Sequence, residues 1–186
     1  MQDLFDNSWY SQFLLGVLAS LLATGIGTAC NWLVAAWRYR RLAGEWEAWW
    51  QPVQPGLPTW VGQTMRIRQR FRKLTLKSLP KGRIDHDARH DNLHFDWGAQ
   101  MQIRGKLYLS GSWYKPGGPG SGAFLLRRSN DDQYLCGYII GDNRDGDVKM
   151  GPFVLGKNRA HVLAGMRWLR DNWREFEPPT EMKGKL

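Results

Sequence analysis

Arginine alternates with apolar residues between positions 65 and 73, and this pattern is the strongest candidate for ligand chemistry in the sequence. On a strand, Arg66, Arg68, Arg70 and Arg72 would share one face, opposite Met65, Ile67 and Phe71. Guanidinium groups make planar, bidentate contacts with phosphate. The alternative is that the apolar residues point into a core and the arginines form a solvated outer face, so that only a bulge would carry some of them inward.

Aromatic side chains and one more arginine on other predicted strands complete the candidate set. If the domain encloses a ligand, such groups would combine stacking surfaces with a few hydrogen-bond donors. These candidates are Trp97, Arg104, Tyr108, Trp113, Tyr134 and Tyr138. Each has a competing interpretation as core packing or as ordinary surface. With Arg66, Arg68 and Arg70 they form the predicted ligand-binding residues.

Two groups of polar residues resemble metal sites, but neither has the required context. His86, His90 and His94 would share a helical face, yet they fall in a polar loop and at the start of the next strand. The acids from Asp142 to Asp147 do not alternate as in a calcium loop, and no distal glutamate follows. We therefore predict no metal and no cofactor.

Sequence motifs for enzymatic chemistry are also missing. The chain has no P-loop, no glycine-rich dinucleotide motif between a strand and a helix, no Gly-x-Ser-x-Gly, and no convincing Cys/His nucleophile pair. We expect a protein without enzymatic activity.

The segment from Ser8 to Trp37 contains no charged side chain and is long enough to cross a bilayer once with some tilt. Trp9, Tyr10, Trp32 and Trp37 lie near its ends, where amphipathic rings favour the headgroup region. All 26 Lys and Arg residues follow position 37. This asymmetry predicts an N-terminus outside and a C-terminal domain in the cytoplasm.

A cleaved signal peptide is the main alternative to an anchor. Its first residues should be basic, whereas Asp3 and Asp6 make this N-terminus acidic. A lipoprotein signal ending at Cys30 would lack the large aliphatic residue expected three positions earlier. Cys30 and Cys136 are the only cysteines and are not expected to meet, which agrees with a reducing cytoplasm.

Small residues recur every fourth position in the apolar segment. Gly16, Ser20, Thr24 and Thr28 would form one helix face, and small side chains let helices approach closely in lipid. We predict that this face supports a homo-oligomer, although small residues are common in any span.

The basic surplus lies in the domain that follows the anchor. Of the 17 acidic residues, Asp3 and Asp6 precede the apolar segment, so the remaining chain is even more basic than the formal +9 of the whole. Such a surplus favours phosphate-bearing partners or an anionic lipid surface, and the tethered domain gains about 1 kcal/mol for each basic residue near acidic lipid. We expect no DNA partner.

Runs of period-two alternation separated by turn residues predict about eight strands after the anchor. The predicted strands cover residues 43–50, 60–69, 71–78, 95–104, 106–114, 123–128, 134–141 and 148–155. The expected turns lie at residues 54–56, 80–82, 104–105, 116–122, 130–132 and 145–146. Eight meandering antiparallel strands are most economically closed as a small barrel, which is large enough to hold one small ligand.

A C-terminal helix should follow the barrel. Asn158 can cap it, and Val162, Met166, Leu169, Trp173 and Phe176 follow helical spacing. The predicted organisation is an anchor with a basic stop at residues 1–41, a barrel at 42–157, a helix packed on the barrel at 158–177, and a tail at 178–186.

Two features resemble known proteins. Gly44-Glu45-Trp46 resembles the Gly-x-Trp that opens the first strand of lipocalin-like barrels. The glycine-marked series at residues 122–126, 135–141 and 148–155, together with the anchor, resembles membrane-anchored β-strand-rich effectors of bacterial anti-phage signalling, in CBASS and related CRISPR accessory systems. Most members of that family have two spans, whereas this chain has one.

The resemblance implies a function for both parts of the chain. The cytoplasmic barrel would bind a cyclic oligonucleotide, and binding would cluster the anchors, disrupt the inner membrane and abort infection. The alternatives are a non-enzymatic anchored scaffold whose basic surface lies on the membrane, and a barrel that carries a lipid or another apolar ligand. Inward arginines and aromatics would favour a nucleotide, whereas an all-apolar lining would favour lipid or no ligand.

Overall fold

The computed structural model describes residues 3–51, 60–70, 73–83, 96–117, 120–142, 148–174 and 183–185. Two compact units make up the chain, Met1–Arg38 and Tyr39–Leu186. The predicted architecture is confirmed: a long apolar N-terminal helix, a closed eight-stranded antiparallel barrel, and a C-terminal helix packed against the barrel.

The first unit is the greater part of one helix, α1 (Asp3–Tyr39). Over its described span, α1 is long and apolar enough to cross a membrane, and its large apolar side chains, such as Leu21 and Leu33, are exposed. The hydroxyls of Thr24 and Thr28 donate to the carbonyl oxygens of Ser20 and Thr24, each at 2.8 Å. Both threonine hydroxyls of the small-residue face are therefore satisfied within the helix, which suits an apolar environment.

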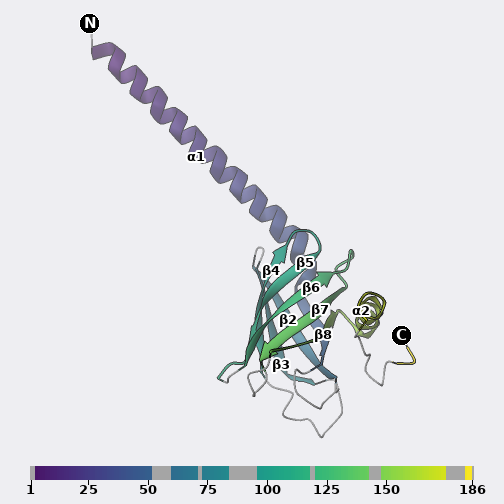
Figure 1. The fold of residues 1–186 in the computed structure, drawn as a ribbon. Coiled ribbons are helices and arrows are strands. Elements are labelled where there is room, and N and C mark those ends of the chain that lie inside the picture. The colour runs from purple at the N-terminus through teal and green to yellow at the C-terminus, as the bar shows by residue number, and fades with distance from the viewer. Residues whose placement is uncertain are drawn as a thin grey trace. The chain divides into compact units, whose positions relative to one another are not determined.

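The second unit begins with the short 3-10 turn η1 (Arg40–Leu42) and continues into the barrel. The strands are β1 (Gly44–Trp50), β2 (Val61–Arg70), β3 (Lys73–Arg83), β4 (Gly98–Arg104), β5 (Tyr108–Tyr114), β6 (Ser121–Arg128), β7 (Tyr134–Asp142) and β8 (Val148–Gly156). Each pairs with the next, and β8 returns to β1 with Trp50 opposite Phe153. Figure 1 shows the barrel from the side, and its closure leaves no free sheet edge among the described strands.

Alternating residues face the interior and the exterior of the barrel. On β2, Met65 and Ile67 are buried inside, whereas Arg66 and Arg68 are exposed outside. On the neighbouring strand β1, Trp46 also points inward and lies opposite Met65. This pattern follows from the two-residue period of a pleated strand with one face in a core.

One predicted turn is wrong. Residues 80–82 were expected to form a turn, but β3 extends to Arg83. Ser78 pairs with Met65 and Arg83 pairs with Gln63, so the β2–β3 register shifts between these two pairs. Pro80 has no backbone N–H to donate to a ladder, and a bulge of this kind accommodates it without ending the strand.

The C-terminal helix α2 (Arg159–Asn172) covers part of the barrel exterior. The side chain of Asn158 accepts a hydrogen bond from the backbone N–H of His161, which confirms the predicted cap. Val162, Met166 and Leu169 pack against residues of β1, β7 and β8, namely Trp49, Cys136 and Val154. The helix ends at Asn172, earlier than the predicted 177, and Phe176 lies outside the described residues.

The rim at which the chain enters the barrel is called the entry end here. Because the strands form a simple meander, this rim is marked by Gly44, Arg70, Lys73, Arg104, Tyr108, Arg128, Tyr134 and Gly156. Leu42 in η1 is fully buried, and its carbonyl oxygen accepts a hydrogen bond from Trp46 Nε1 at 2.9 Å. Residues immediately before the first strand are thus part of the barrel's packing.

Candidate functional site

The described interior of the barrel is filled, and most of its side chains are apolar. The rings of Trp50, Trp97, Phe124 and Phe153 form a connected cluster with centroid separations of 5.5 to 6.3 Å. The surrounding Met65, Leu74, Leu76, Leu109, Leu126 and Leu135 are all fully buried. A lumen large enough for water would expose these side chains, so the described interior is a packed core, as eight strands permit.

Only two of the predicted ligand-binding residues face this interior. Trp97 is buried, and its Nε1 donates to Gln63 Oε1 at 3.3 Å. Trp113 is half-buried; its Nε1 donates to the Ile140 carbonyl oxygen at 2.9 Å. A Cβ added at Gly141 would lie 2.4 Å from the Trp113 ring, so glycine is required beneath it. Both indoles are thus satisfied by the protein itself.

The other seven do not line the interior. Arg66, Arg68, Arg70 and Arg104 are exposed on the outer surface, so the alternative interpretation of the arginine pattern is confirmed for these positions. Tyr108 is exposed beside Arg104 on the neighbouring strand. Two tyrosines face α2 instead, Tyr134 against the helix-packing cluster and Tyr138 with its ring 5.2 Å from that of Trp173. These arginines and tyrosines therefore do not line the interior, and a role for them in binding a ligand at the outer surface stays a prediction.

The predicted polar groups elsewhere mostly fall outside the described residues. This applies to Arg72, to His86, His90 and His94, and to the acids at 145 and 147. Within the described part of the chain, no three His, Cys, Asp or Glu residues lie close enough to hold a metal ion. Burial raises the pKa of the Cys136 thiol to about 12, so this cysteine stays protonated and is a poor nucleophile.

The outer surface of β2, β3 and β4 carries a cluster of exposed cations that we call the basic face. It consists of Arg66, Arg68, Arg70, Lys73, Lys77 and Arg104. Arg66 lies directly opposite Lys77, and Arg70 lies directly opposite Lys73. Like charges at opposed positions destabilise a sheet, and among the described outward residues of β2–β5 no carboxylate offsets them. Among the ion pairs of the described residues, Glu45 on β1 binds Arg66 at 2.6 Å.

Neutral hydrogen-bonding groups continue the basic face along the same rows. Gln102 and Ser110 follow Lys73 across β4 and β5, and Gln100 follows Thr75. Arg104 Nε donates to the Ser110 hydroxyl at 3.3 Å. Cations surrounded by amides and hydroxyls can hold phosphate oxygens by charge and by hydrogen bonds together.

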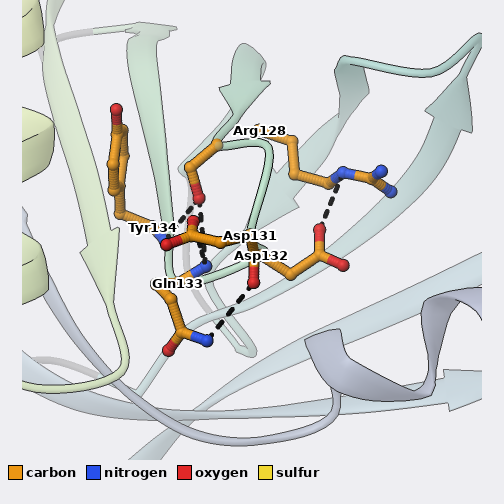
Figure 2. Close-up of polar contacts among 6 residues, drawn as sticks. Arg128, Asp131, Asp132, Gln133 and Tyr134 are labelled. Atoms are coloured by element: carbon orange, nitrogen blue, oxygen red, sulfur yellow. Dashed lines mark hydrogen bonds and ion pairs between the residues drawn. The ribbon is translucent and has the colours of Figure 1, made fainter.

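A buried ion pair at the entry end was missed by the sequence analysis. Arg128 Nε lies 2.8 Å from Asp132 Oδ1, and the two side chains are only 10% and 9% exposed. Figure 2 shows the pair beside the turn that joins β6 to β7. The Nε–H group is not aligned with the carboxylate, and the buried Nη1 has no hydrogen-bond partner among the described residues. The alternation of Phe124, Leu126 and Arg128 was the signal that this arginine points inward.

The turn that presents Asp132 is fixed by its own hydrogen bonds. The Ser129 hydroxyl accepts from the backbone N–H groups of Gln133 and Tyr134, at 3.0 and 3.1 Å (Figure 2). Asp132 has φ of 62°, a left-handed conformation that aspartate tolerates better than most residues. The Ser129 hydroxyl also lowers the pKa of Asp131.

Burial raises the pKa of the Asp132 carboxyl above its usual value, and the nearby Arg128, Arg41 and Lys157 offset this only in part. Burial likewise lowers the pKa of Lys157, whose Nζ donates to the Ala43 carbonyl oxygen at 2.8 Å and lies 4.3 Å from the Trp46 ring. The entry end thus contains several partly desolvated charges close to the start of the barrel.

Replacing Arg128 with methionine should make the stability of the barrel strongly pH-dependent. Without Arg128, the pKa of Asp132 rises further, because the main attraction that lowers it is lost. A carboxyl whose pKa is raised by folding stabilises the fold below its unfolded pKa and loses that contribution as pH rises through the folded pKa. Urea unfolding should therefore show a loss of about 3 kcal/mol near neutral pH and a smaller loss near about pH 4.

The exposed Arg170, which pairs with Asp171 at 3.1 Å, provides the matched control. Arg170→Met should change stability by less than about 0.5 kcal/mol at either pH. An equal loss for Arg128→Met at both pH values would contradict the assigned direction of the Asp132 shift.

Comparison with known proteins gives no assignment. No protein-family model matches the chain, and no curated protein matches it. The proposed function therefore rests on the fold, on the basic face and on the charged residues at the entry end.

Proposed function

We propose that this protein is a membrane-anchored, non-enzymatic scaffold whose barrel binds anionic lipid through the basic face. The observation that carries the proposal is the set of exposed, like-charged cross-strand neighbours on β2 and β3, in a chain whose N-terminal helix has the length and composition of a membrane span. Lipid phosphates would relieve the repulsion between these cations, and the anchor keeps the barrel near lipid at high local concentration.

The packed interior favours this function over carriage of a ligand inside the barrel. A nucleotide or apolar ligand in the interior would have to displace side chains such as Trp97 and Phe153, which contact each other at a centroid separation of 5.9 Å. Displacing well-packed core rings costs several kcal/mol each. Binding on the outer surface has no such cost.

Neutralising the basic face tests the proposal. The barrel unit, residues 39–186, should partition onto phosphatidylglycerol vesicles through these cations, and replacement of four of them with glutamine should abolish most of the binding. Unchanged partition of the neutralised variant would refute the assigned surface.

A cyclic oligonucleotide sensor is the second candidate, and one observation favours it. Arg104 and Tyr108 are opposed on β4 and β5, so an exposed guanidinium and an exposed phenol ring lie side by side on the basic face. Such a pair offers phosphate binding and base stacking together. In this version the ligand binds outside the barrel, and the face with Gly16, Ser20, Thr24 and Thr28 clusters the anchors in the bacterial inner membrane to disrupt it.

Thermal unfolding of residues 39–186 with cyclic di-, tri- and tetranucleotides separates the two candidates. A ligand that binds only the folded state must stabilise it. The scaffold proposal predicts no shift with any member of the panel. A shift of several degrees with a single cyclic oligonucleotide, lost in Arg104→Gln and Tyr108→Ala, would establish the sensor instead.

A further inference from the structure

The last residue of the apolar helix and the residues that follow it are held by contacts to separate parts of the barrel. Tyr39 is 5% exposed, and the Arg128 guanidinium carbon lies 5.3 Å from the centroid of its ring. The Leu42 carbonyl oxygen accepts from Trp46 on β1, and the Ala43 carbonyl oxygen accepts from Lys157 after β8. Residues 39–43 are therefore a fixed part of the barrel unit and not a free linker.

Arg128 is the residue that joins this segment to the β6–β7 turn. Its guanidinium contacts the Tyr39 ring and is paired with Asp132 Oδ1. Asp132 in turn is held by the turn, because its backbone N–H donates to the Ser129 carbonyl oxygen at 3.2 Å. A change in the position of Tyr39 must alter the environment of a buried charge, and a change in the turn must do the same from the other side.

We infer that Tyr39, Arg128 and Asp132 form a latch that couples the end of the N-terminal helix to the β6–β7 turn. The latch transmits a displacement of the helix end into the barrel, or of the turn into the helix end, whichever ligand the protein binds. The inference goes beyond the proposed lipid binding and does not depend on it.

The physical basis is the cost of separating the three groups. A buried guanidinium that loses the aromatic ring or the carboxylate keeps its desolvation penalty and loses a compensating partner. Both contacts therefore favour the same closed arrangement, and coupling between two sites is reciprocal by thermodynamic necessity. Opening of residues 39–43 must therefore weaken the turn by the same factor by which opening of the turn weakens residues 39–43.

Amide hydrogen exchange on the full chain in detergent micelles tests this reciprocity. Arg128→Met should speed exchange at residues 41–44 by about tenfold or more. Tyr39→Leu keeps an apolar side chain and removes the ring, and it should speed exchange at residues 132–134, whose N–H groups bond to Ser129. The double variant should change both segments by less than the product of the single effects.

Internal and external controls separate coupling from general loosening. Exchange in β4 and β5 should stay unchanged in each variant, and Arg170→Met should alter neither segment. If Arg128→Met prevents folding, Arg128→Lys keeps the charge without the planar contact, and the Tyr39→Leu experiment stands alone. The latch would be refuted if Tyr39→Leu left residues 132–134 unchanged while Arg128→Met affected only the turn.

Discussion

Replacing Phe153 with alanine is expected to destabilise the barrel by about 4 kcal/mol. Phe153 is fully buried on β8, opposite Trp50 at the β8–β1 closure, and its ring also contacts Trp97 and Phe124. Truncation removes the centre of the aromatic cluster and leaves a cavity that rigid strands on all sides cannot fill. Urea unfolding of residues 39–186, followed by tryptophan fluorescence, measures the loss.

Met150 on the same strand is the matched control, because it points outward and is 53% exposed. Met150→Ala should cost less than about 0.5 kcal/mol. Similar losses for the two variants would mean that the interior is not the packed core described above, and a ligand-holding lumen would again be possible.

Neutralising the basic face should have the largest effect on binding. Replacement of Arg68, Arg70, Lys73 and Arg104 with glutamine removes about 1 kcal/mol of lipid attraction for each residue. The sum, about 4 kcal/mol, corresponds to a roughly thousandfold loss in affinity for phosphatidylglycerol vesicles. Stability should change little, because all four side chains are exposed and Arg70 and Lys73 repel one another across the strands.

A control with the same change in net charge separates the basic face from general electrostatics. Lys115, Arg167, Arg170 and Arg174 are also exposed but lie outside the basic face. Replacing them with glutamine should lower vesicle affinity by tenfold or less. Equal losses in the two variants would show that total charge, and not the basic face, governs binding.

The sequence predicted the architecture well because each element has a strong local signal. Alternation of apolar and polar residues identified the strands, and the prediction of a closed barrel rested on the cost of free sheet edges. Asn158 and the apolar spacing of Val162, Met166 and Leu169 located the C-terminal helix. The turn at 80–82 was wrong because turn residues also occur in bulges, where the partner strand keeps the chain extended.

The candidate site was less predictable because it depends on which face of each strand points inward. For β2 the apolar face decided the question, and Arg66, Arg68 and Arg70 are outside. Tyr134 and Tyr138 lie under α2, and no local pattern says which strands a distant helix will cover. The Arg128–Asp132 pair joins the end of a strand to a turn, and tertiary structure alone buries it.

The most direct test of the proposed function is co-sedimentation of wild-type residues 39–186 with vesicles of phosphatidylglycerol and phosphatidylcholine, at low and high salt. Binding through the basic face predicts strong association with vesicles that contain phosphatidylglycerol, none with pure phosphatidylcholine, and loss of binding as salt screens the charges. Equal binding to both vesicles, or no binding to either, would contradict the proposal that this barrel is a lipid-binding scaffold.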